Sequence, residues 1–402
     1  MAKGRRFFCW LVRFVFLGSA VFLSLGGPLP GILARAFPSL SPVVVIAGSI
    51  GNRHWYLTLF WVAPPLVFLI LAFLRGRFFC RWFCPAGTLY TLFSRWSIKR
   101  PLLKRRVNGI LFWAIMGGAL AGAPLLFLAD PLPTFNRLSV FWNRTYTAAA
   151  LLPGLILPFF LLLGFVQPMV WCTHFCPLGY MMDLSRNLKK RNRLSVDGVK
   201  RDVVVGLAVG FPVALLAKKM PFASFLKAGA EHPIVPPGAR SPTSFAGNCS
   251  RCYACVNACP THVIRVKAAP GPRLGQLFHP VIDPEYGYCD EFCTACTEVC
   301  HSGALVRLDE EAKRHCQIGI AKVEKDACLA WDKGEYCMVC QEFCPYHAVE
   351  TDESSDGIPR PVVNREVCRG CGICQNQCPA IEKGKAIFVH GQPQQGRAQD
   401  VF

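Results

Sequence analysis

The feature that most constrains this chain is a run of four cysteines closed by a proline near the C-terminus. The run reads Cys368-x2-Cys371-x2-Cys374-x3-Cys378-Pro379. This spacing wraps three thiolates around one [4Fe–4S] cluster and offers the fourth thiolate to a second cluster. A second complete copy comprises Cys249, Cys252, Cys255 and Cys259, followed by Pro260. Two full copies in one chain favour iron–sulfur ligation over a zinc site.

Two less regular groups of cysteines lie between these copies. They are Cys289, Cys293, Cys296 and Cys300, followed by His301 where proline would stand, and Cys328, Cys337, Cys340 and Cys344, followed by Pro345. Four groups of four cysteines predict four [4Fe–4S] clusters. Short strand-like runs between the groups suggest ferredoxin-like modules. We therefore predict an α+β ferredoxin-like polyferredoxin domain over 249–385, a linker over 227–248 and a C-terminal tail over 386–402.

In two-cluster ferredoxins the fourth cysteine of each run ligates the cluster of the other run. Applied here, the rule leads us to expect that the two regular groups exchange their fourth cysteines and that the two irregular groups do the same. Cys378 would then join Cys249, Cys252 and Cys255, while Cys259 joins Cys368, Cys371 and Cys374. Cys344 would join Cys289, Cys293 and Cys296, while Cys300 joins Cys328, Cys337 and Cys340.

The first half of the chain differs sharply in charge from the second. Residues 1–218 hold 25 Lys/Arg and 4 Asp/Glu, against 19 and 21 in residues 219–402. The basic residues fall in short clusters between apolar runs, which indicates a membrane protein with positive loops inside rather than nucleic-acid binding. The apolar runs 7–27, 55–74, 108–129 and 149–171 predict four transmembrane helices in a domain over 1–202.

The junction after residue 202 decides where the cysteine groups would lie. An uncharged run over 203–217 predicts a fifth transmembrane helix, assigned to 203–226, and the alternative is an interfacial or buried helix. The expected location is a multi-pass protein of the bacterial inner membrane, with membrane lipid around it. Its N-terminus would be cytoplasmic and its cluster domain periplasmic.

An internal repeat connects two segments of the first half. Phe79-Cys80-x3-Cys84-Pro85-x-Gly87 matches Trp171-Cys172-x3-Cys176-Pro177-x-Gly179 at an offset of 92 residues. These four cysteines could hold a fifth [4Fe–4S] cluster. Paired structural thiols, a redox-active disulfide and sites completed by a partner are the alternatives.

The chain resembles known ferredoxin-type proteins over nearly its whole length. Its first half, with two C-x3-C-P motifs, is similar to the NapH and MauN membrane proteins. Its second half is similar to the four-cluster NapG and MauM proteins. This second likeness depends on Pro236-Pro-Gly-Ala239, Cys249-Ser-Arg-Cys252 and the spaced third group. The resemblance implies a fusion of two partners that transfer electrons.

We therefore expect an iron–sulfur protein that passes electrons between the quinol pool, or a cytoplasmic donor, and a periplasmic reductase or c-type cytochrome. Arg53, His54 and Asp130 are the candidates for a quinol site. A maturation or redox-priming factor for a periplasmic metalloenzyme, and a subunit of a larger respiratory complex, are the alternatives. No residues form a hydrolytic or molybdenum site, so we expect no self-contained substrate active site.

Overall fold

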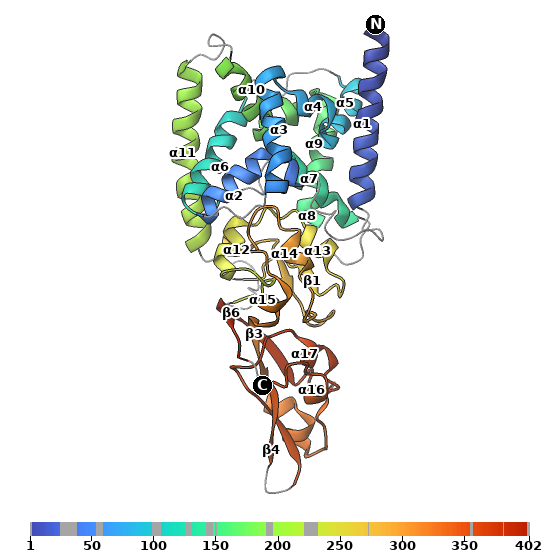
Figure 1. The fold of residues 1–402 in the computed structure, drawn as a ribbon, viewed down its shortest axis with the longest axis vertical. Coiled ribbons are helices and arrows are strands. Elements are labelled where there is room, and N and C mark those ends of the chain that lie inside the picture. The colour runs from blue at the N-terminus through green and yellow to red at the C-terminus, as the bar shows by residue number, and fades with distance from the viewer. Residues whose placement is uncertain are drawn as a thin grey trace.

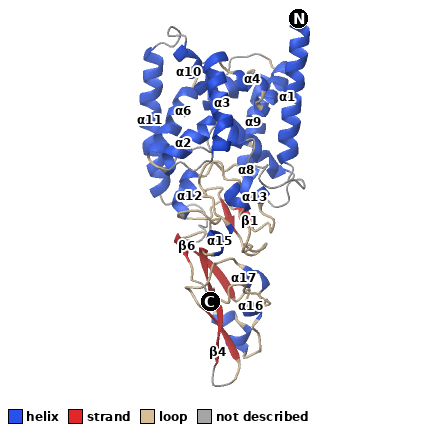
Figure 2. Ribbon diagram, in the orientation of Figure 1, coloured by secondary structure: helices blue, strands red, loops and turns tan. Residues whose placement is uncertain are grey.

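The protein consists of a helical part followed by a tapering part of short strands and loops (Figures 1 and 2). The computed structural model describes residues 2–24, 38–53, 59–98, 106–125, 130–141, 148, 151–189, 196–220, 232–271, 273–353, 357–380 and 382–399. The N-terminus lies at the outer end of the helical part, and the hairpin that includes β4 lies at the opposite end of the molecule (Figure 1).

The helical part packs eleven α-helices of very different lengths among the described residues. They are α1 (Ala2–Ser24), α2 (Pro42–Asn52), α3 (Leu59–Arg75), α4 (Phe78–Trp82), α5 (Pro85–Phe93), α6 (Asn108–Leu120), α7 (Pro131–Asn136), α8 (Leu151–Gly154), α9 (Ile156–Val166), α10 (Pro177–Lys189) and α11 (Val196–Lys219). Prolines 42, 85 and 131 begin their helices, where the missing N–H costs nothing. Phe79, Ile115, Leu157, Leu178 and Met182 are among the fully buried core residues.

The contact between α6 and α11 is unusually close because of glycine. A Cβ atom on Gly210 would lie 2.1 Å from the carbonyl oxygen of Ala114. A Cβ atom on Gly206 would lie 2.4 Å from the Cβ of Trp113. Only glycine at these two positions lets the two helix backbones approach so closely.

Within the described part of the chain, none of the helices has both the length and the apolar composition that crossing a membrane requires. This finding contradicts the predicted fold class, a domain of about five transmembrane helices, and the predicted inner-membrane location with a periplasmic cluster domain. The apolar run 108–129 gives only the 13-residue α6, which rises roughly 20 Å. The run 149–171 is divided between α8 and the 11-residue α9.

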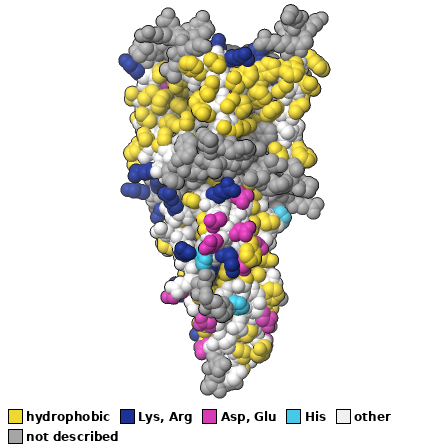
Figure 3. Space-filling model, viewed as in Figure 1, with side chains coloured by type: hydrophobic (Ala, Val, Ile, Leu, Met, Phe, Trp, Pro, Cys, Tyr) yellow, Lys and Arg dark blue, Asp and Glu magenta, His cyan; other side chains and the backbone are white. Residues whose placement is uncertain are grey.

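The two longest helices carry charge within the predicted spans or next to them. Arg13 lies inside α1, and α11 holds Lys200, Arg201 and Asp202 before its apolar stretch. Figure 3 shows hydrophobic side chains gathered over the helical part, while acidic and basic side chains mix over the tapering part. The charge difference between the two halves of the sequence is thus visible on the surface.

The tapering part contains short helices and three antiparallel strand pairs. Its helices are α12 (Pro242–Asn248), α13 (Ala254–Ala258), α14 (Ala295–Glu298), α15 (Glu310–Arg314), α16 (Val339–Glu342) and α17 (Ile373–Gln377). Its strands are β1 (Ile264–Val266), β2 (Pro280–Ile282), β3 (Cys316–Val323), β4 (Val349–Glu353), β5 (Pro359–Val363) and β6 (Ile387–Arg397). The pairs are β1 with β2, β3 with β6 and β4 with β5.

Two segments predicted as linker and tail take part in this fold. Residues 232–248 include α12 and the buried residues Ile234 and Val235. The tail forms β6, which pairs with β3 from Val323 opposite Ile387 to Cys316 opposite Arg397. The tapering part is therefore longer than the predicted 249–385.

Candidate metal centres

The internal repeat folds in the same way in both copies. Cys84 and Cys176 each precede a helix that begins with proline, and each thiol accepts a backbone N–H bond of 3.3 Å, from Gly87 and Gly179 respectively. In both copies the second cysteine also donates its own N–H to the carbonyl oxygen five residues earlier. The repeat that the sequence predicts is therefore a repeat of backbone geometry.

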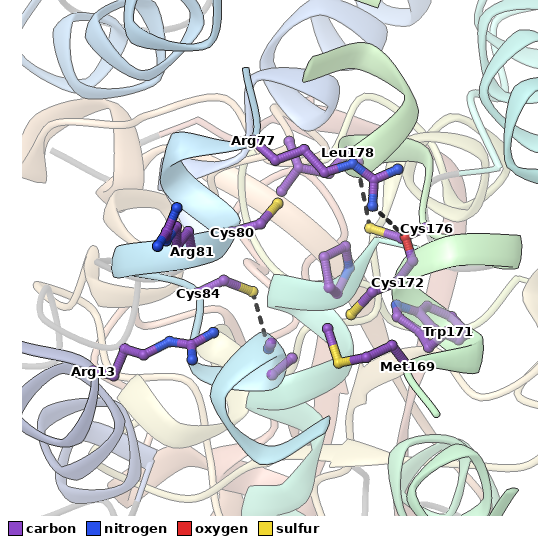
Figure 4. A pocket seen from close by; sticks show the side chains of 14 residues that line it. Arg13, Arg77, Cys80, Arg81, Cys84, Met169, Trp171, Cys172, Cys176 and Leu178 are labelled. Atoms are coloured by element: carbon purple, nitrogen blue, oxygen red, sulfur yellow. Dashed lines mark hydrogen bonds between the residues drawn. The ribbon is translucent and has the colours of Figure 1, made fainter. Parts of the chain in front are cut away.

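The four repeat cysteines line one cavity of about 250 Å³ in the helical part, here named site A: Cys80, Cys84, Cys172 and Cys176. Figure 4 shows their sulfurs gathered around a common space, with side chains of Arg13, Arg77 and Arg81 at its border. A water molecule takes up about 30 Å³, so the space is much larger than a single ion needs. Its positive border suits a group with a net negative charge.

Burial raises the pKa of Cys80 to about 12 and that of Cys84 to about 12. Burial also raises the pKa of Cys172 and Cys176, and thiols of the opposite copy add to both shifts. Because a metal cluster binds thiolates, loading of site A must release the protons of these thiols. Four such thiols from two distant segments form a donor set that fits one [4Fe–4S] cluster.

The sixteen cysteines of the tapering part also lie in sets of four. Burial, together with the neighbouring Cys300 thiolate, raises the pKa of Cys252 to about 11. The Cys300 thiolate also contributes to the raised pKa of Cys249 and to that of Cys255. These four cysteines form site B: Cys249, Cys252, Cys255 and Cys300. In the same way, the Cys259 thiolate contributes to the raised pKa of Cys289, Cys293 and Cys296. These four cysteines form site C.

The second half of the tapering part repeats this exchange. After burial, which is the largest cause, the Cys344 thiolate contributes to the raised pKa of Cys368, Cys371 and Cys374. These four cysteines form site D. A small cavity is bordered by the remaining four cysteines, which form site E: Cys328, Cys337, Cys340 and Cys378.

The expected exchange of fourth cysteines is present, but the predicted partners are wrong. The first group exchanges with the second and the third with the fourth, instead of the two regular groups with each other. A short antiparallel strand pair connects two cysteine groups that follow each other in the sequence. The pair of β1 and β2, for example, lies between Cys259 of the first group and Cys289 of the second. Neighbouring groups can therefore close into one module without a long connection.

The loops around these sites present backbone donors to sulfur, as a bound cluster requires. Leu305 donates to Cys300 at 3.3 Å, Ala348 to Cys344 at 3.3 Å, and Ala386 to Cys378 at 3.4 Å. Among the described residues, no three ligating side chains converge on a single-ion site. Four thiols spread around a space suit a cluster, in which each iron takes one thiolate.

Direct contacts connect one site to the next. The backbone N–H of Cys289 in site C donates to the carbonyl oxygen of Cys371 in site D at 2.8 Å. At the other end of the first module, Asn136 at the end of α7 donates to the carbonyl oxygen of Cys252 in site B at 2.7 Å. Asp130, which caps the start of α7, acts electrostatically on Cys84 and Cys176 of site A. Helix α7 is about 9 Å long.

Of the three residues predicted for a quinol site, the structure describes Arg53 and Asp130, which have different neighbours. Asp130 is fully buried and bonds Ser41 and the N–H of Leu132. Arg53 ends α2 and lies within electrostatic range of Lys218. His54 lies outside the described residues.

Sequence reasoning missed the charged neighbours of the sites. Arg77 borders site A and forms a two-bond ion pair with Asp183 at 2.9 and 2.6 Å. Arg137 is buried beside site B. Nothing in the spacing of either arginine distinguishes it from the basic residues of a loop. His301 was visible as a departure from the Cys-Pro pattern.

The fold and the cysteine sites define a class: an iron–sulfur protein of the polyferredoxin type. Comparison with protein families agrees. Residues 57–107 and 149–195 match the family described as "4Fe-4S binding domain". Residues 248–304 and 335–381 match the "4Fe-4S dicluster domain". The first dicluster match covers sites B and C, whereas the second covers most ligands of sites D and E.

Curated relatives match about two fifths of the chain. The ferredoxin-type protein NapF of Escherichia coli K12 is 30% identical over 162 residues, 40% of this chain and 88% of NapF. NapG of the same strain is 32% identical over 161 residues, 37% of this chain and 68% of NapG. The methylamine utilization ferredoxin-type protein MauM of Methylobacillus flagellatus is 30% identical over 155 residues, 37% of this chain and 64% of MauM.

The chain belongs to the Nap/Mau-type ferredoxin proteins. It binds several [4Fe–4S] clusters and acts in ferredoxin-type electron transfer. No solved structure matches it.

Proposed function

We propose that the chain carries electrons along one series of five [4Fe–4S] clusters, from site A in the helical part to site E in the second module. When bound, the clusters supply one-electron transfer without rearrangement of covalent bonds. The protein's own contribution is to hold the five cysteine sets in a fixed order. All sixteen cysteines of sites B to E, and the four of site A, act as ligands in this proposal.

The observation that carries the proposal is the contact between Cys289 and Cys371. A 2.8 Å backbone hydrogen bond joins a ligand loop of the first module to a ligand loop of the second. The Cys289 thiolate also contributes to the raised pKa of Cys371, after burial and Cys368. Two separate two-cluster modules therefore form one continuous series.

Site A joins this series through α7. The two segments that match the "4Fe-4S binding domain" family each supply two cysteines to one cavity, which supports one shared cluster rather than two. At one end of α7, Asp130 lies within electrostatic range of Cys84 of site A. At the other end, Asn136 donates a hydrogen bond to the carbonyl oxygen of Cys252 of site B. The side chains between them fill the gap with protein rather than solvent, since α7 is buried.

For the donor we propose a quinol. A cavity of about 140 Å³ lies between α11 and the loop at 273–276, with apolar walls and the polar ends of Lys218, Arg273 and Gln276. The carbonyl oxygen of Gly275 in this wall accepts a bond of 2.9 Å from Arg251 of the site B loop. A quinol head group there would lie next to site B, so its electrons would enter the series at site B, and site A would extend the series from that point into the helical part.

For the acceptor we propose a reductase or a c-type cytochrome that docks at site E. Tyr336 is 80% exposed and directly precedes the ligand Cys337. An exposed aromatic ring beside a ligand gives a partner protein a short contact to the last site. Slow transfer at this end would instead favour the alternative role of a maturation or redox-priming factor.

The test uses the full chain, purified and loaded without oxygen, with menadiol as donor and cytochrome c as acceptor. The loaded protein should contain about twenty irons, four for each cluster. Cys293→Ser/Cys296→Ser removes two ligands of site C, and we expect menadiol-driven cytochrome c reduction to fall at least tenfold. Cys316→Ser changes a cysteine outside the five sites and should transfer electrons at the wild-type rate.

Transfer at the wild-type rate by the site C variant would exclude the series as the route. Reduction by dithionite but not by menadiol would exclude the quinol donor alone. About sixteen irons per chain would remove site A from the series.

A further inference from the structure

His301 occupies the position at which the other three fourth cysteines are followed by proline. Cys259, Cys344 and Cys378 precede Pro260, Pro345 and Pro379, whereas Cys300 precedes His301. His301 follows Cys300 directly, and its Nδ1 lies 3.6 Å from the sulfur of the site B ligand Cys252, so the departure concerns this site. Site B is also the site that contacts the helical part of the protein.

The imidazole of His301 is held against the thiolates of site B. Its residue is 1% exposed. Nδ1 lies 3.6 Å from the sulfur of Cys252, and Nε2 lies 3.3 Å from the hydroxyl oxygen of Ser250. With the proton on Nδ1, the ring donates to the Cys252 sulfur and accepts at Nε2 from the Ser250 hydroxyl. A proline at this position could provide neither contact.

Two buried guanidinium groups lie beside the same site. Arg137 is 1% exposed and donates from Nε to the carbonyl oxygen of Arg251 at 3.0 Å and from Nη2 to that of Ser250 at 2.9 Å. Arg251 is 4% exposed, and its backbone N–H donates to the sulfur of Cys249 at 3.4 Å. Both guanidinium groups lie within electrostatic range of the Cys249 thiol.

Reduction adds negative charge to an iron–sulfur cluster, so positive charge and N–H donors at its sulfurs raise the reduction potential. We propose that His301, supported by Arg137 and Arg251, raises the reduction potential of site B above those of sites C, D and E. This inference rests on the proposed function, because it requires that the four sites hold clusters. An electron that moves from site C to site B oxidises the former and reduces the latter, with no change in bonds or protons.

With this order of reduction potentials, the first electron that enters the tapering part would reduce site B, which lies at the junction between the helical part and the first module. The other sites have different neighbours. At site C, the buried ammonium group of Lys313 donates to the carbonyl oxygen of Asp290 at 2.8 Å and also bonds the Cys289 thiol. At site D, the buried Arg369 lies within electrostatic range of Cys368. Each of these sites thus has one buried cation, whereas site B has two guanidinium groups and the imidazole. At site E, the ligand Cys337 adjoins the exposed Tyr336 and faces the open end of the molecule. His301 is therefore a residue that adjusts the potential of one cluster through its ligand.

The test is a redox titration of the loaded full chain, followed by electron paramagnetic resonance. We expect one component of the wild type to be reduced first, and Cys249→Ser/Cys252→Ser should abolish it. His301→Leu keeps an apolar side chain without a donor. The His301→Leu variant should lower the reduction potential of this component by at least about 59 mV, which is a tenfold change in the equilibrium constant for one electron. His301→Gln keeps an N–H donor and should retain most of the wild-type value.

His347→Leu is the matched control, because His347 is exposed and lies three residues after the fourth cysteine Cys344. It should leave the first component unchanged. Equal potentials in the wild type, or an unchanged component in His301→Leu, would overturn the inference while leaving the clusters in place. If His301→Leu fails to load site B, two other measurements test the inference. They are the order of the reduction potentials in the wild type and the potential of site B in His301→Gln. Iron well below sixteen per chain would instead count against the proposed function.

Discussion

The backbone N–H of Cys289 donates to the carbonyl oxygen of Cys371 across 2.8 Å, although the two residues lie 82 positions apart. Each residue is a predicted ligand, one in site C and the other in site D. The hydrogen bond therefore joins two dicluster modules at their ligand loops rather than at their outer surfaces. Electrons that pass between the two modules could therefore cross from the Cys289 loop to the Cys371 loop through this hydrogen bond.

The exchange of fourth cysteines between neighbouring groups can be tested by counting iron. Cys249→Ser/Cys252→Ser/Cys300→Ser removes three ligands of site B only, so we expect a loss of about four irons per chain. Cys249→Ser/Cys252→Ser/Cys259→Ser removes two ligands of site B and one of site C, so we expect damage to two clusters. Iron and acid-labile sulfide on anaerobically loaded protein measure both. Equal losses in the two triple variants would contradict the observed pairing.

The shared cluster of site A gives a second prediction. Cys84→Ser and Cys176→Ser come from different copies of the repeat, yet each should destabilise the same cluster, and the double variant should lose no more than about four irons. Two separate sites would give additive losses. Cys9→Ser, which changes a cysteine outside the site A cavity, is the control and should keep the full iron content.

The sequence predicted what spacing alone determines. The division of sixteen cysteines into four groups, the principle of exchange and the repeat that builds site A all follow from intervals along the chain. The partners of the exchange did not follow, because a spacing gives no sign of which loops close on each other. The β1–β2 pair lies between Cys259 and Cys289. Short strand-like runs between the groups were predicted, but such a run does not show which other run it pairs with.

Two other differences also have physical causes. Strand β6 contains Gly391-Gln-Pro-Gln-Gln-Gly396, which has no alternation of apolar and polar residues, so it resembled a tail. It pairs with β3, and Gly391 leaves room for Pro233 and the carbonyl oxygen of His232. In the helical part, proline and glycine divide the apolar runs: Gly122, with a φ of +70°, follows α6 and turns the chain. Hydropathy alone does not show where such a run stops being one helix.

The loop of site D depends on a glycine that no other residue can replace. Gly370 has a φ of +72°, and a Cβ atom there would lie 2.4 Å from the backbone of Gly319 in β3. Gly370→Ala should therefore cost the left-handed backbone penalty of about 1 kcal/mol and, in addition, displace the loop from β3. We expect the thermal midpoint to fall by at least about 3 °C, with a partial loss of iron.

Gly357→Ala is the matched control for this variant. Gly357 has a φ of +74°, but nothing lies within 4 Å of the added Cβ. It should lose only about 1 °C, the equivalent of about 1 kcal/mol in a protein of this size, and no iron. Equal shifts in the two variants would mean that the close approach of Gly370 to β3 contributes nothing.

The last prediction concerns Asp130 at the start of α7. Burial raises the pKa of this carboxyl group to about 6, although Ser41 and the N–H of Leu132 bond to it. A carboxyl group whose pKa is higher in the folded protein holds its proton more tightly there than in the unfolded chain. Its contribution to stability is therefore complete below about pH 4 and is lost as the pH rises through 6. The loss corresponds to roughly 3 kcal/mol.

Asp130→Asn keeps an oxygen that can accept from Leu132 and stays neutral at every pH. We expect the variant to match the wild type near pH 4.5 and to exceed its thermal midpoint by about 3–4 °C at pH 8, since each kcal/mol is worth about 1 °C in a protein of this size. Thermal midpoints of equally loaded proteins between these pH values measure the difference. Asp326→Asn, at an exposed carboxylate, should follow the wild type throughout. A constant difference between Asp130→Asn and the wild type across this range would show that the carboxyl group does not titrate there.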